Sequence, residues 1–397
     1  MSIEIRRPTD DEWEDVCRAD GRAFGVAYTT EEMAERRPFH DMTRFRIAVD
    51  DGEIVSTAGS YPFDVTLPGG TCVPMGGVTW VSTLATHRRR GIMRQVVEAV
   101  HADIDERGEP LASLWASEGS IYEHLQYGVA AQIRMTTIDP RRTGIRAEFR
   151  PAPNTVRYAE GEAAFDAMAD IWERFRRGRA GEISHDPAHE EAVLARRQRP
   201  EGALSAAFYL LHHDGYAIYR IEAKWNAGHP AHTMQVIEFA AVTTEAHAAL
   251  WHALLSVDLI GEIRSSIIPL DDPLPFLLEN QRALRTTDLN DSIWVNVRDA
   301  SICFGARSYR TSDRLVVDVD GTRWAIEGGP DGGSCRRVRT RPDLVTSHAW
   351  FSALLYGGTL PSALVAGRRM TARTDEVLHR ADLFFPTSLA PYCQSHY

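Results

Sequence analysis

The sequence predicts an α+β fold that is divided into several domains. The chain has 397 residues, which is more than a single hydrophobic core usually organises. Its expected strands mostly come in consecutive pairs joined by tight turns such as Asp51-Gly52, which is the pattern of antiparallel pairing. The stretch from Gly77 to Gly128 differs, because there a strand leads through a basic, glycine-containing turn into an amphipathic helix.

Composition and charge bound the possible functions. The chain is 44% apolar and 25% charged, as soluble globular proteins are, and its net charge of −11 argues against nucleic acid as the main partner. Five scattered cysteines lack the paired spacing of a metal site, so we expect reduced thiols and no metal. The N-terminus has no signal-peptide core, and no stretch reaches the roughly 18 apolar residues that span a membrane. We therefore expect a cytoplasmic protein without a membrane partner.

Strand and helix alternate before Gly77. Residues 3–5 are expected to form a short strand, and Thr9 is a cap for a helix that reaches about Phe24. Strands are expected at 45–49 and 54–65 because apolar and polar residues alternate there. The order is that of an α+β domain.

The stretch that begins at Gly77 predicts an anion site. Val78 to Leu84 is rich in β-branched residues, as a strand should be. Arg88-Arg89-Arg90-Gly91 follows, and apolar residues then recur at helical spacing until about Gly108. The first amides of a helix are unpaired donors at its positive end, and glycine lets a ligand approach the backbone. With arginines beside it, such a turn suits a pyrophosphate.

A family pattern fits these residues. Arg88-x-x-Gly91-x-Met93 resembles the Arg/Gln-x-x-Gly-x-Gly/Ala signature of GNAT acetyltransferases, with Met93 departing at the last position. The string from Thr86 to Met93 and the segment Ala116-Ser117-Glu118-Gly119-Ser120-Ile121-Tyr122 make the chain similar to the enhanced intracellular survival (Eis) type of GNAT enzyme, in which a bulky last residue is usual. The alternative is a solvated charge run beside an ordinary turn.

The order of strand, turn and helix returns in the second third of the chain. A hairpin over 209–219 is followed by a strand at 234–242 and a helix through Leu255. The turn before that helix contains Glu245 but neither glycine nor arginine, and an acidic turn would repel a pyrophosphate. We therefore expect a degenerate domain that binds no cofactor.

The resemblance implies tandem GNAT folds, of which only the first is catalytic, followed by a sterol-carrier-protein-like α/β domain. The expected domains are a catalytic GNAT domain over 1–145, a degenerate GNAT-like domain over 146–286, and a sterol-carrier-like domain over 287–397 whose terminus reaches the active site. Between them, we expect 129–138 to close the first sheet, 141–154 to be a linker and 285–291 to be a junction. The last domain is expected to contain strands at 293–297, 315–319 and 323–326 and helices at 347–356 and 360–366.

The cosubstrate that the resemblance implies is acetyl-CoA. The expected contacts lie on the strand, in the turn and in the segment after Ala116: Val81, Ser82, Thr83, Arg88, Arg89, Arg90, Gly91, Ile92, Met93 and Ser117. Backbone amides between Val81 and Thr83 could bind the thioester oxygen. For Ser117, the alternative is a helix N-cap.

Tyr122 is the expected general acid, because the resemblance places it at the tyrosine that protonates the departing thiolate. A phenol with an ordinary pKa near ~10 can do so, although Tyr122 could instead only pack at a helix start. The resemblance also assigns the base to the terminal carboxylate, here that of Tyr397. An α-carboxyl has an ordinary pKa near ~3.5 and is a poor base unless desolvated, so its alternative role is to hold the substrate ammonium. Glu118 and His396 are competing bases.

The acceptor pocket is expected to include Phe24, Trp80 and Glu118, with Trp80 facing opposite to Val81. The resemblance implies N-acetylation of aminoglycosides, polyamines or lysine side chains by direct transfer, in a homohexamer. Core packing is the alternative for Trp80, since the chain has nine tryptophans. Two other functions stay open: an acyl-CoA or lipid-binding protein without catalysis, and an N-acyltransferase with a longer acyl donor.

Overall fold

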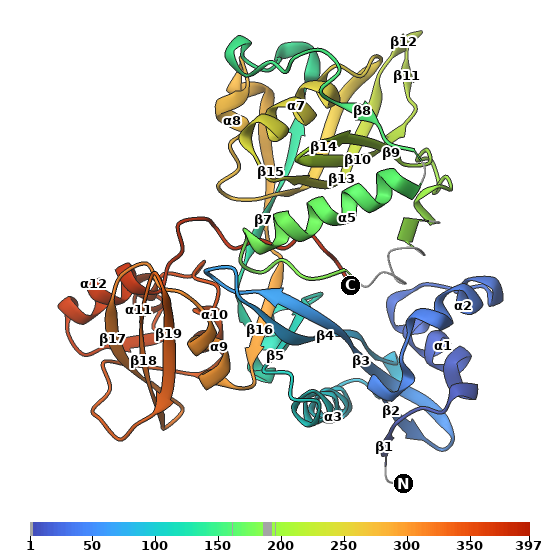
Figure 1. The fold of residues 1–397 in the computed structure, drawn as a ribbon. Coiled ribbons are helices and arrows are strands. Elements are labelled where there is room, and N and C mark those ends of the chain that lie inside the picture. Colours follow the sequence, from blue (N-terminus) through green and yellow to red (C-terminus); the bar gives the residue numbers. More distant parts are fainter. Residues whose placement is uncertain (1–2, 161, 186–192, 195) are drawn as a thin grey trace. The chain divides into compact units, whose positions relative to one another are not determined.

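The computed structural model describes residues 3–160, 162–185, 193–194 and 196–397, which divide into two compact units (Figure 1). Unit 1 consists of Met1–Ala130, Ile293–Pro386 and His396–Tyr397. Unit 2 consists of Ala131–Ser292 and Thr387–Ser395. The expectation of more than one domain is therefore met by units that are each assembled from separate chain segments.

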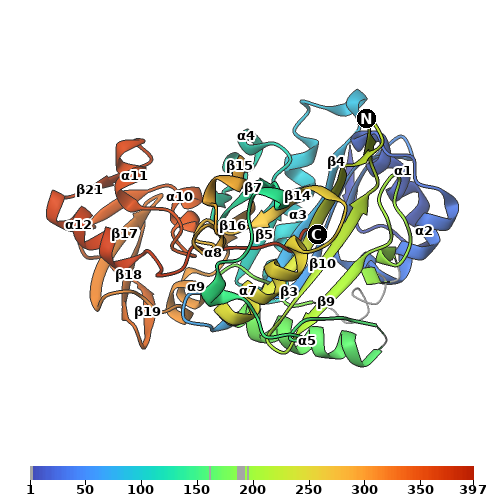
Figure 2. The ribbon, with the colours of Figure 1, turned by 90° about the horizontal axis from the view of Figure 1, so that it is seen from above.

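A seven-stranded sheet in the order β1-β2-β3-β4-β5-β16-β6 forms one part of unit 1 (Figures 1 and 2). Pairing is antiparallel from β1 to β4, parallel between β4 and β5, and antiparallel on both sides of β16. The strands are β1 (Glu4–Arg6), β2 (Phe45–Asp50), β3 (Glu53–Thr66), β4 (Cys72–Thr83), β5 (Leu111–Trp115), β6 (Gly128–Val129) and β16 (Ile293–Val297).

Helices cover both faces of this sheet, because successive strand residues point to opposite sides. On β2, Phe45 and Ile47 join the core under α1 (Trp13–Phe24), while Ala48 joins the core under α3 (Ile92–Glu106). Thr9 and Glu12 form a capping box at the 3-10 turn Asp10–Glu12, which leads directly into α1. The remaining helices of this region are α2 (Thr30–Arg36) and the single turn α4 (Gly119–Tyr122).

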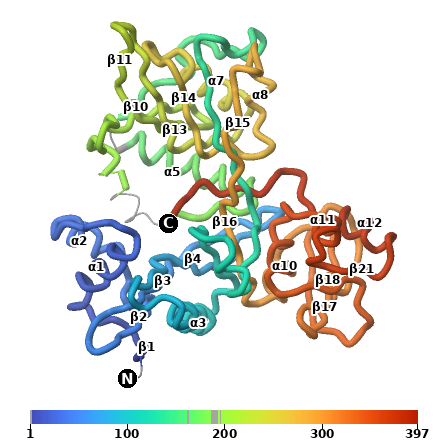
Figure 3. Tube along the Cα trace, turned by 180° about the vertical axis from the view of Figure 1, so that it is seen from behind, coloured from blue at the N-terminus to red at the C-terminus, as the bar shows by residue number. Residues whose placement is uncertain are grey.

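The other part of unit 1 is a five-stranded mixed sheet in the order β19-β18-β17-β20-β21. Figure 3 labels β17, β18 and β21 of this sheet. Its strands are β17 (Asp313–Val319), β18 (Thr322–Gly329), β19 (Gly332–Arg337), β20 (Leu344–Thr346) and β21 (Met370–Ala372). Its helices are α9 (Ala300–Ala306), α10 (His348–Ala353), α11 (Pro361–Ala366) and α12 (Asp375–Phe384). The expected strands and helices beyond residue 313 are therefore confirmed, while the likeness to sterol carriers stays a prediction.

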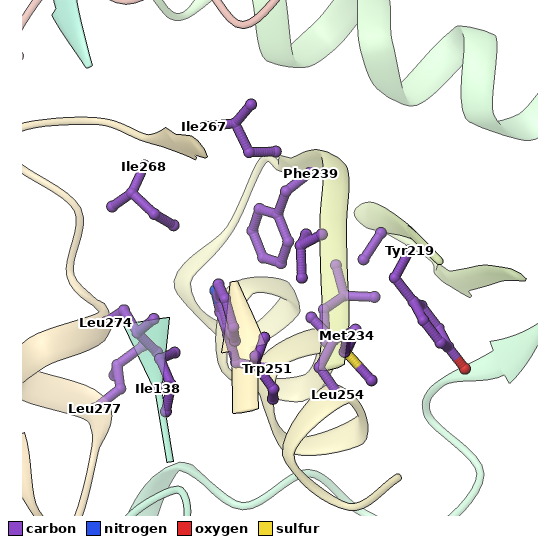
Figure 4. Packing of buried hydrophobic residues seen from close by; sticks show 14 of the residues in the cluster. Ile138, Tyr219, Met234, Phe239, Trp251, Leu254, Ile267, Ile268, Leu274 and Leu277 are labelled. Carbon is purple, nitrogen blue, oxygen red and sulfur yellow. The ribbon is translucent and has the colours of Figure 1, made fainter. Parts of the chain in front are cut away.

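Unit 2 contains a seven-stranded sheet in the order β15-β7-β14-β13-β10-β9-β8. The apolar side chains of Phe239, Trp251 and Leu254 meet in its core (Figure 4). The strands are β7 (Gln132–Ile138), β8 (Arg157–Tyr158), β9 (Phe208–His212), β10 (Gly215–Glu222), β13 (His232–Ala241), β14 (Ile260–Ile268) and β15 (Leu284–Asp291). The helices are α5 (Glu162–Arg177), α7 (Thr244–Leu255) and α8 (Leu274–Leu277), and β11 (Trp225–Asn226) pairs with β12 (His229–Pro230).

The prediction that 129–138 closes the first sheet is wrong. β7 belongs to the second sheet, where it pairs with β14 and β15, and β16 takes the expected place beside β5 (Figure 1). All five residues of β16 are buried, as in a central strand, although we assigned them to the last domain. The residues expected as a junction, 285–291, belong to β15, whose polar and mostly exposed residues give no strand signal. The chain passes from unit 2 to unit 1 directly after this strand, between Ser292 and Ile293. Sequence patterns predict strands but do not identify their partners.

Gly128 should be required for the close approach of α10 to β6. A Cβ at Gly128 would collide with the carbonyl oxygen of Ala349 and lie 2.9 Å from the amide nitrogen of Ala353, both backbone atoms that cannot rotate away. We predict that Gly128→Ala lowers the stability of unit 1 by about 1–3 kcal/mol, measured by thermal or denaturant unfolding. Gly305→Ala is the control, because the nearest described atom outside its own helix, the Cys335 amide nitrogen, is 3.7 Å from the added Cβ. Equal midpoints for both variants would contradict the prediction.

Candidate active site

The turn between β4 and α3 has the geometry of an anion site. Gly91 is the N-cap of α3 in the left-handed conformation (φ +74°), and Arg88, Arg89 and Arg90 beside it are exposed. The Arg90 guanidinium lies 3.3 Å from an Asp50 carboxylate oxygen, which restrains it near the turn. The first amides of a 15-residue helix thus adjoin three cationic side chains.

The residues after Gly91 explain the departure from the family signature. Ile92 is buried in the core beneath α3, and Met93 packs against the same core. The bulky side chain at the last motif position therefore points towards hydrophobic residues, so it does not fill the turn. Ile92 and Met93 contribute backbone amides to the site and apolar anchors to the helix.

β4 and β5 part within the sheet. Their pairing runs only from Met75 with Leu111 to Gly77 with Ser113, while β4 continues to Thr83 alongside β3. Beyond Gly77, no described strand pairs with the β5 side of β4. Alternate backbone amides on that side are therefore available to a ligand.

A β-bulge lies on the unpaired half of β4. Gly59 pairs with Thr79, but Thr57 pairs with Ser82, so β4 carries one extra residue between these pairs. Trp80 has the positive φ of +54° that such a bulge accommodates. The bulge turns the Trp80 side chain to the α1 side, while Val81 packs on the α3 side, as expected.

The side chains of Ser82 and Thr83 face β3. Ser82 Oγ lies 2.7 Å from Thr57 Oγ1, and Thr83 Oγ1 lies 2.8 Å from Ser56 Oγ. These hydroxyls therefore tie the two strands together. If this stretch contacts a ligand, its backbone is the available part.

Tyr122 and Ser117 lie together on the α3 side. Tyr122 is the last residue of α4 and is 5% exposed, and Ser117 forms a side-chain hydrogen bond with it. Burial raises the pKa of Tyr122 above its ordinary value, and the bond from Ser117 opposes that rise. The phenol is thus protonated at neutral pH. The N-cap of α4 is Glu118, so Ser117 does not have the alternative capping role.

The C-terminal Tyr397 lies where β4 and β5 part. Its hydroxyl is 2.5 Å from Ser113 Oγ, and its ring centroid is 4.9 Å from that of Phe63. A Cβ on Gly77 would lie 2.8 Å from the Tyr397 ring, so glycine is needed for this contact. The last two residues of the chain therefore belong to unit 1, next to the unpaired half of β4.

The competing bases are placed differently. The His396 ring lies 5.0 Å from that of Trp115, and its partial burial lowers the pKa of the imidazole, which favours the neutral form. Glu118 is exposed at the start of α4. His396 is thus beside the end of β5, whereas Glu118 faces solvent.

Trp80 belongs to an aromatic cluster under α1 and α2. Its ring centroid is 5.5 Å from that of Trp13, 6.2 Å from that of Tyr28 and 5.0 Å from that of His40. Phe24 ends α1 with 53% of its surface exposed, and the described ring contacts of Trp80 do not include it. The structure therefore does not bring the three predicted pocket residues together around Trp80.

Sequence reasoning missed Tyr61 and His40. Trp80 Nε1 donates to Tyr61 Oη at 2.9 Å, and Tyr61 Oη lies 2.8 Å from His40 Nε2. A signal was available, because counting outward from the turn at Gly69 places Tyr61 opposite Gly77, where the structure has it. The hairpin register therefore points to Tyr61, but nothing local marks His40.

Two family models match the chain, each described as an acetyltransferase (GNAT) domain, over residues 4–130 and 181–298. N-acetyltransferase Eis of Mycobacterium tuberculosis, like that of Mycobacterium bovis, is 30% identical to it over alignments that cover 98% of both chains. The chain belongs to the Eis-type GNAT family. An uncharacterized N-acetyltransferase of Streptomyces avermitilis is 31% identical over 99% of both chains.

Solved structures agree with this Eis-type membership. The crystal structure of Eis1 from Mycobacterium abscessus superimposes with a TM-score of 0.86 at 28% identity over the full length of both chains. A GCN5-related N-acetyltransferase from Anabaena variabilis, at 14% identity and a TM-score of 0.83, shares the fold. The chain is thus an acetyltransferase with tandem GNAT domains, and GNAT domains use acetyl-CoA as cosubstrate.

The second GNAT domain of this Eis-type chain differs at the turn that precedes its helix. α7 begins after Thr243, whose hydroxyl accepts a hydrogen bond from the Ala246 amide, and Glu245 lies in the first turn. The capping side chain occupies the amide that an anion would use, and the carboxylate adds repulsion. This turn is therefore unsuited to a pyrophosphate.

Across 3–160, 162–185, 193–194 and 196–397, no group of three or more His, Cys, Asp or Glu side chains is arranged to hold a metal ion. Within the same ranges, no helix combines the length and apolar character needed to cross a bilayer.

The arginine turn should determine affinity for CoA. We predict that Arg88→Ala combined with Arg89→Ala weakens CoA binding about tenfold or more, because charge-assisted hydrogen bonds to phosphate each contribute roughly 1.5–3 kcal/mol. Calorimetric titration with CoA measures this, and the loss should diminish at high salt. Arg18→Ala combined with Arg22→Ala is the charge-matched control, since Arg18 pairs with Glu14 and Asp15 and Arg22 pairs with Glu53. Unchanged affinity in the double variant would contradict the assignment.

Proposed function

We propose that this chain transfers the acetyl group of acetyl-CoA directly to a primary amine, without a covalent enzyme intermediate. The observation that carries the proposal is the parting of β4 and β5 at Gly77 and Ser113, with the Tyr397 ring at that point. Family membership supports the reaction type.

The residues present fit acetyl-CoA, which supplies an activated acetyl thioester. The exposed arginines and the N-terminus of α3 suit the pyrophosphate. The unpaired amides of β4 suit the extended, amide-containing arm, and the bulge near Val81 could direct an amide at the thioester oxygen. The contacts proposed for Val81, Ser82 and Thr83 are therefore backbone contacts.

Tyr122 is the proposed general acid for the thiolate. Its raised pKa keeps the phenol protonated, and the hydrogen bond with Ser117 orients it. Tyr122 joins the core on the α3 side of the sheet, whereas the rings of Phe63 and Tyr61 lie on the α1 side with Trp80. A thioester between the strands is thereby accessible to the acid from one side and to the acceptor from the other, as direct transfer requires.

The proposed acceptors are cationic amines, such as aminoglycosides, polyamines or lysine side chains. The carboxylate of Tyr397 would attract an ammonium, because the two groups carry opposite charges. The negative net charge of −11 acts in the same direction. The homohexamer stays a prediction, which size-exclusion chromatography with light scattering would test.

Removing the Tyr122 hydroxyl should lower the rate of the chemical step. We predict that Tyr122→Phe decreases kcat about 100-fold or more, the usual contribution of a general acid, with little change in CoA affinity. Thiol release at saturating acetyl-CoA and spermidine measures it. Tyr158→Phe, at an exposed tyrosine of unit 2, is the control and should retain activity. A Tyr122→Phe enzyme with unchanged kcat would leave Tyr122 with only a packing role.

The terminal carboxylate is tested by a chain extended by one alanine after Tyr397, with an alanine added before Met1 as control. We expect thiol release from acetyl-CoA with polyamines, aminoglycosides or lysine peptides in the native and control chains, and its loss in the extended chain. Release from both native and extended chains would exclude the carboxylate. If no chain released thiol although each bound CoA, the rival function of a binding protein would be favoured. Lipid extraction from the purified protein would then test that function. Comparing acetyl-CoA with longer acyl-CoAs tests the other rival.

A further inference from the structure

We propose that Tyr61 and His40 accept the proton that the acceptor ammonium must lose, with His40 acting through the Tyr61 phenol. The inference rests on the proposed function and assigns a step within it. The terminal carboxylate would then hold the ammonium, for which a weakly basic group suffices, and the neutral imidazole of His40 would take the proton.

The neighbouring hydrogen bonds determine which atom donates in the bond between Tyr61 and His40. His40 Nδ1 lies 2.7 Å from the carbonyl oxygen of Arg36, which can only accept, so Nδ1 carries the proton and Nε2 is an acceptor. The Trp80 indole N–H can only donate, so it donates to Tyr61 Oη. The Tyr61 hydroxyl proton is therefore directed at His40 Nε2, at 2.8 Å.

The pair adjoins the place where the acceptor is expected. Tyr61 pairs with Gly77 on β4, the last residue that pairs with β5. Its ring centroid is 6.2 Å from that of Phe63, which in turn contacts Tyr397. Tyr61 is only partly buried, whereas His40 is 6% exposed, so His40 would connect to a ligand through Tyr61.

A second histidine–tyrosine pair in unit 1 shows what a purely structural pair is like. His101 Nε2 lies 2.7 Å from Tyr127 Oη, but Tyr127 is fully buried under α3. The two histidines are equally buried, each 6% exposed, so the two pairs differ in the tyrosine. Tyr61 is partly exposed and lies opposite Gly77, whereas Tyr127 is inaccessible to a ligand.

The protons balance. As the ammonium gives one proton to Tyr61 Oη, the original phenol proton passes to His40 Nε2, and the neutral imidazole becomes an imidazolium that still donates from Nδ1 to Arg36. The free amine then forms the amide bond as the thioester C–S bond breaks. As the amide forms, the amine releases its second proton to solvent, and Tyr122, which has given its own proton to the thiolate, takes a proton back from solvent. His40 returns its proton to solvent by the reverse route. Burial raises the pKa of Tyr61, so the phenol passes the proton on and is not itself the base.

Other groups around the pair also titrate or carry charge. Arg37 Nη1 donates to the His40 carbonyl oxygen, and the Arg36 guanidinium lies over the Tyr28 ring. Tyr28 Oη lies 3.3 Å from an oxygen of Asp20, whose pKa burial raises to about 6. Asp20 thus titrates in the range of a histidine, and the experiment must separate the two.

The test compares two acceptors in wild type, His40→Gln and Tyr61→Phe. Spermidine is an ammonium at the assay pH, whereas a hydrazide with a pKa below it is already neutral. Glutamine can keep the bonds to Arg36 and Tyr61 but cannot take the proton. We expect both variants to lose about 100-fold in kcat/KM with spermidine and less than fivefold with the hydrazide. Their spermidine activity should also lose its histidine-like rise with pH. Affinity for CoA reports that each variant is folded.

Equal losses of kcat/KM with both acceptors would overturn the relay and leave the pair a structural role. Unchanged kcat/KM with spermidine would also overturn the relay. The Asp20→Asn variant should keep the rise of spermidine activity with pH. If Asp20→Asn instead lost this rise while His40→Gln kept it, the titrating group would be Asp20 and the proposal would be overturned. Tyr127→Phe, at the buried pair, should reduce stability without changing the pH profile. A wild type that acetylates neither acceptor would refute the proposed function itself, which separates that failure from failure of the relay.

Discussion

The incomplete pairing of β4 with β5 is the constraint on which the rest of the site depends. Two parallel strands that stayed paired would satisfy each other's amides and leave no opening. Here pairing stops at Gly77 and Ser113, and the rings of Phe63 and Tyr397 occupy the space that a side chain on Gly77 would need. The aromatic rings thus depend on the glycine, and the free amides of β4 depend on the parting of the strands.

The bulge at Trp80 places neighbouring apolar side chains of β4 on opposite sides of the sheet. Without the extra residue, Val78 and Trp80 would point to the same side. With it, Val78 and Val81 pack under α3, while Trp80 reaches the aromatic cluster under α1. The strand therefore supports the helix that carries the anion site on one side and lines the side of the proposed acceptor on the other.

Much of this site could be predicted from the sequence, because its signals are local. Gly91 needs a left-handed backbone and Tyr397 is the chain end, so each is marked by its type or its position. Other features depend on partners that local patterns do not contain. β16 and β7 are predicted as strands but placed in the wrong sheets, and the polar residues of β15 give no strand signal. His40 becomes interesting only through its bond to Tyr61.

The insertion of β16 between β5 and β6 has a consequence for biosynthesis. When the ribosome has produced the residues that match the first family model, 4–130, the strand that belongs between β5 and β6 is still more than 160 residues away. Until then β5 has an open edge, which is the kind of edge that recruits other chains. The nascent catalytic sheet therefore has to wait for nearly three quarters of the protein, and a fragment trimmed to the family match would lack its own central strand.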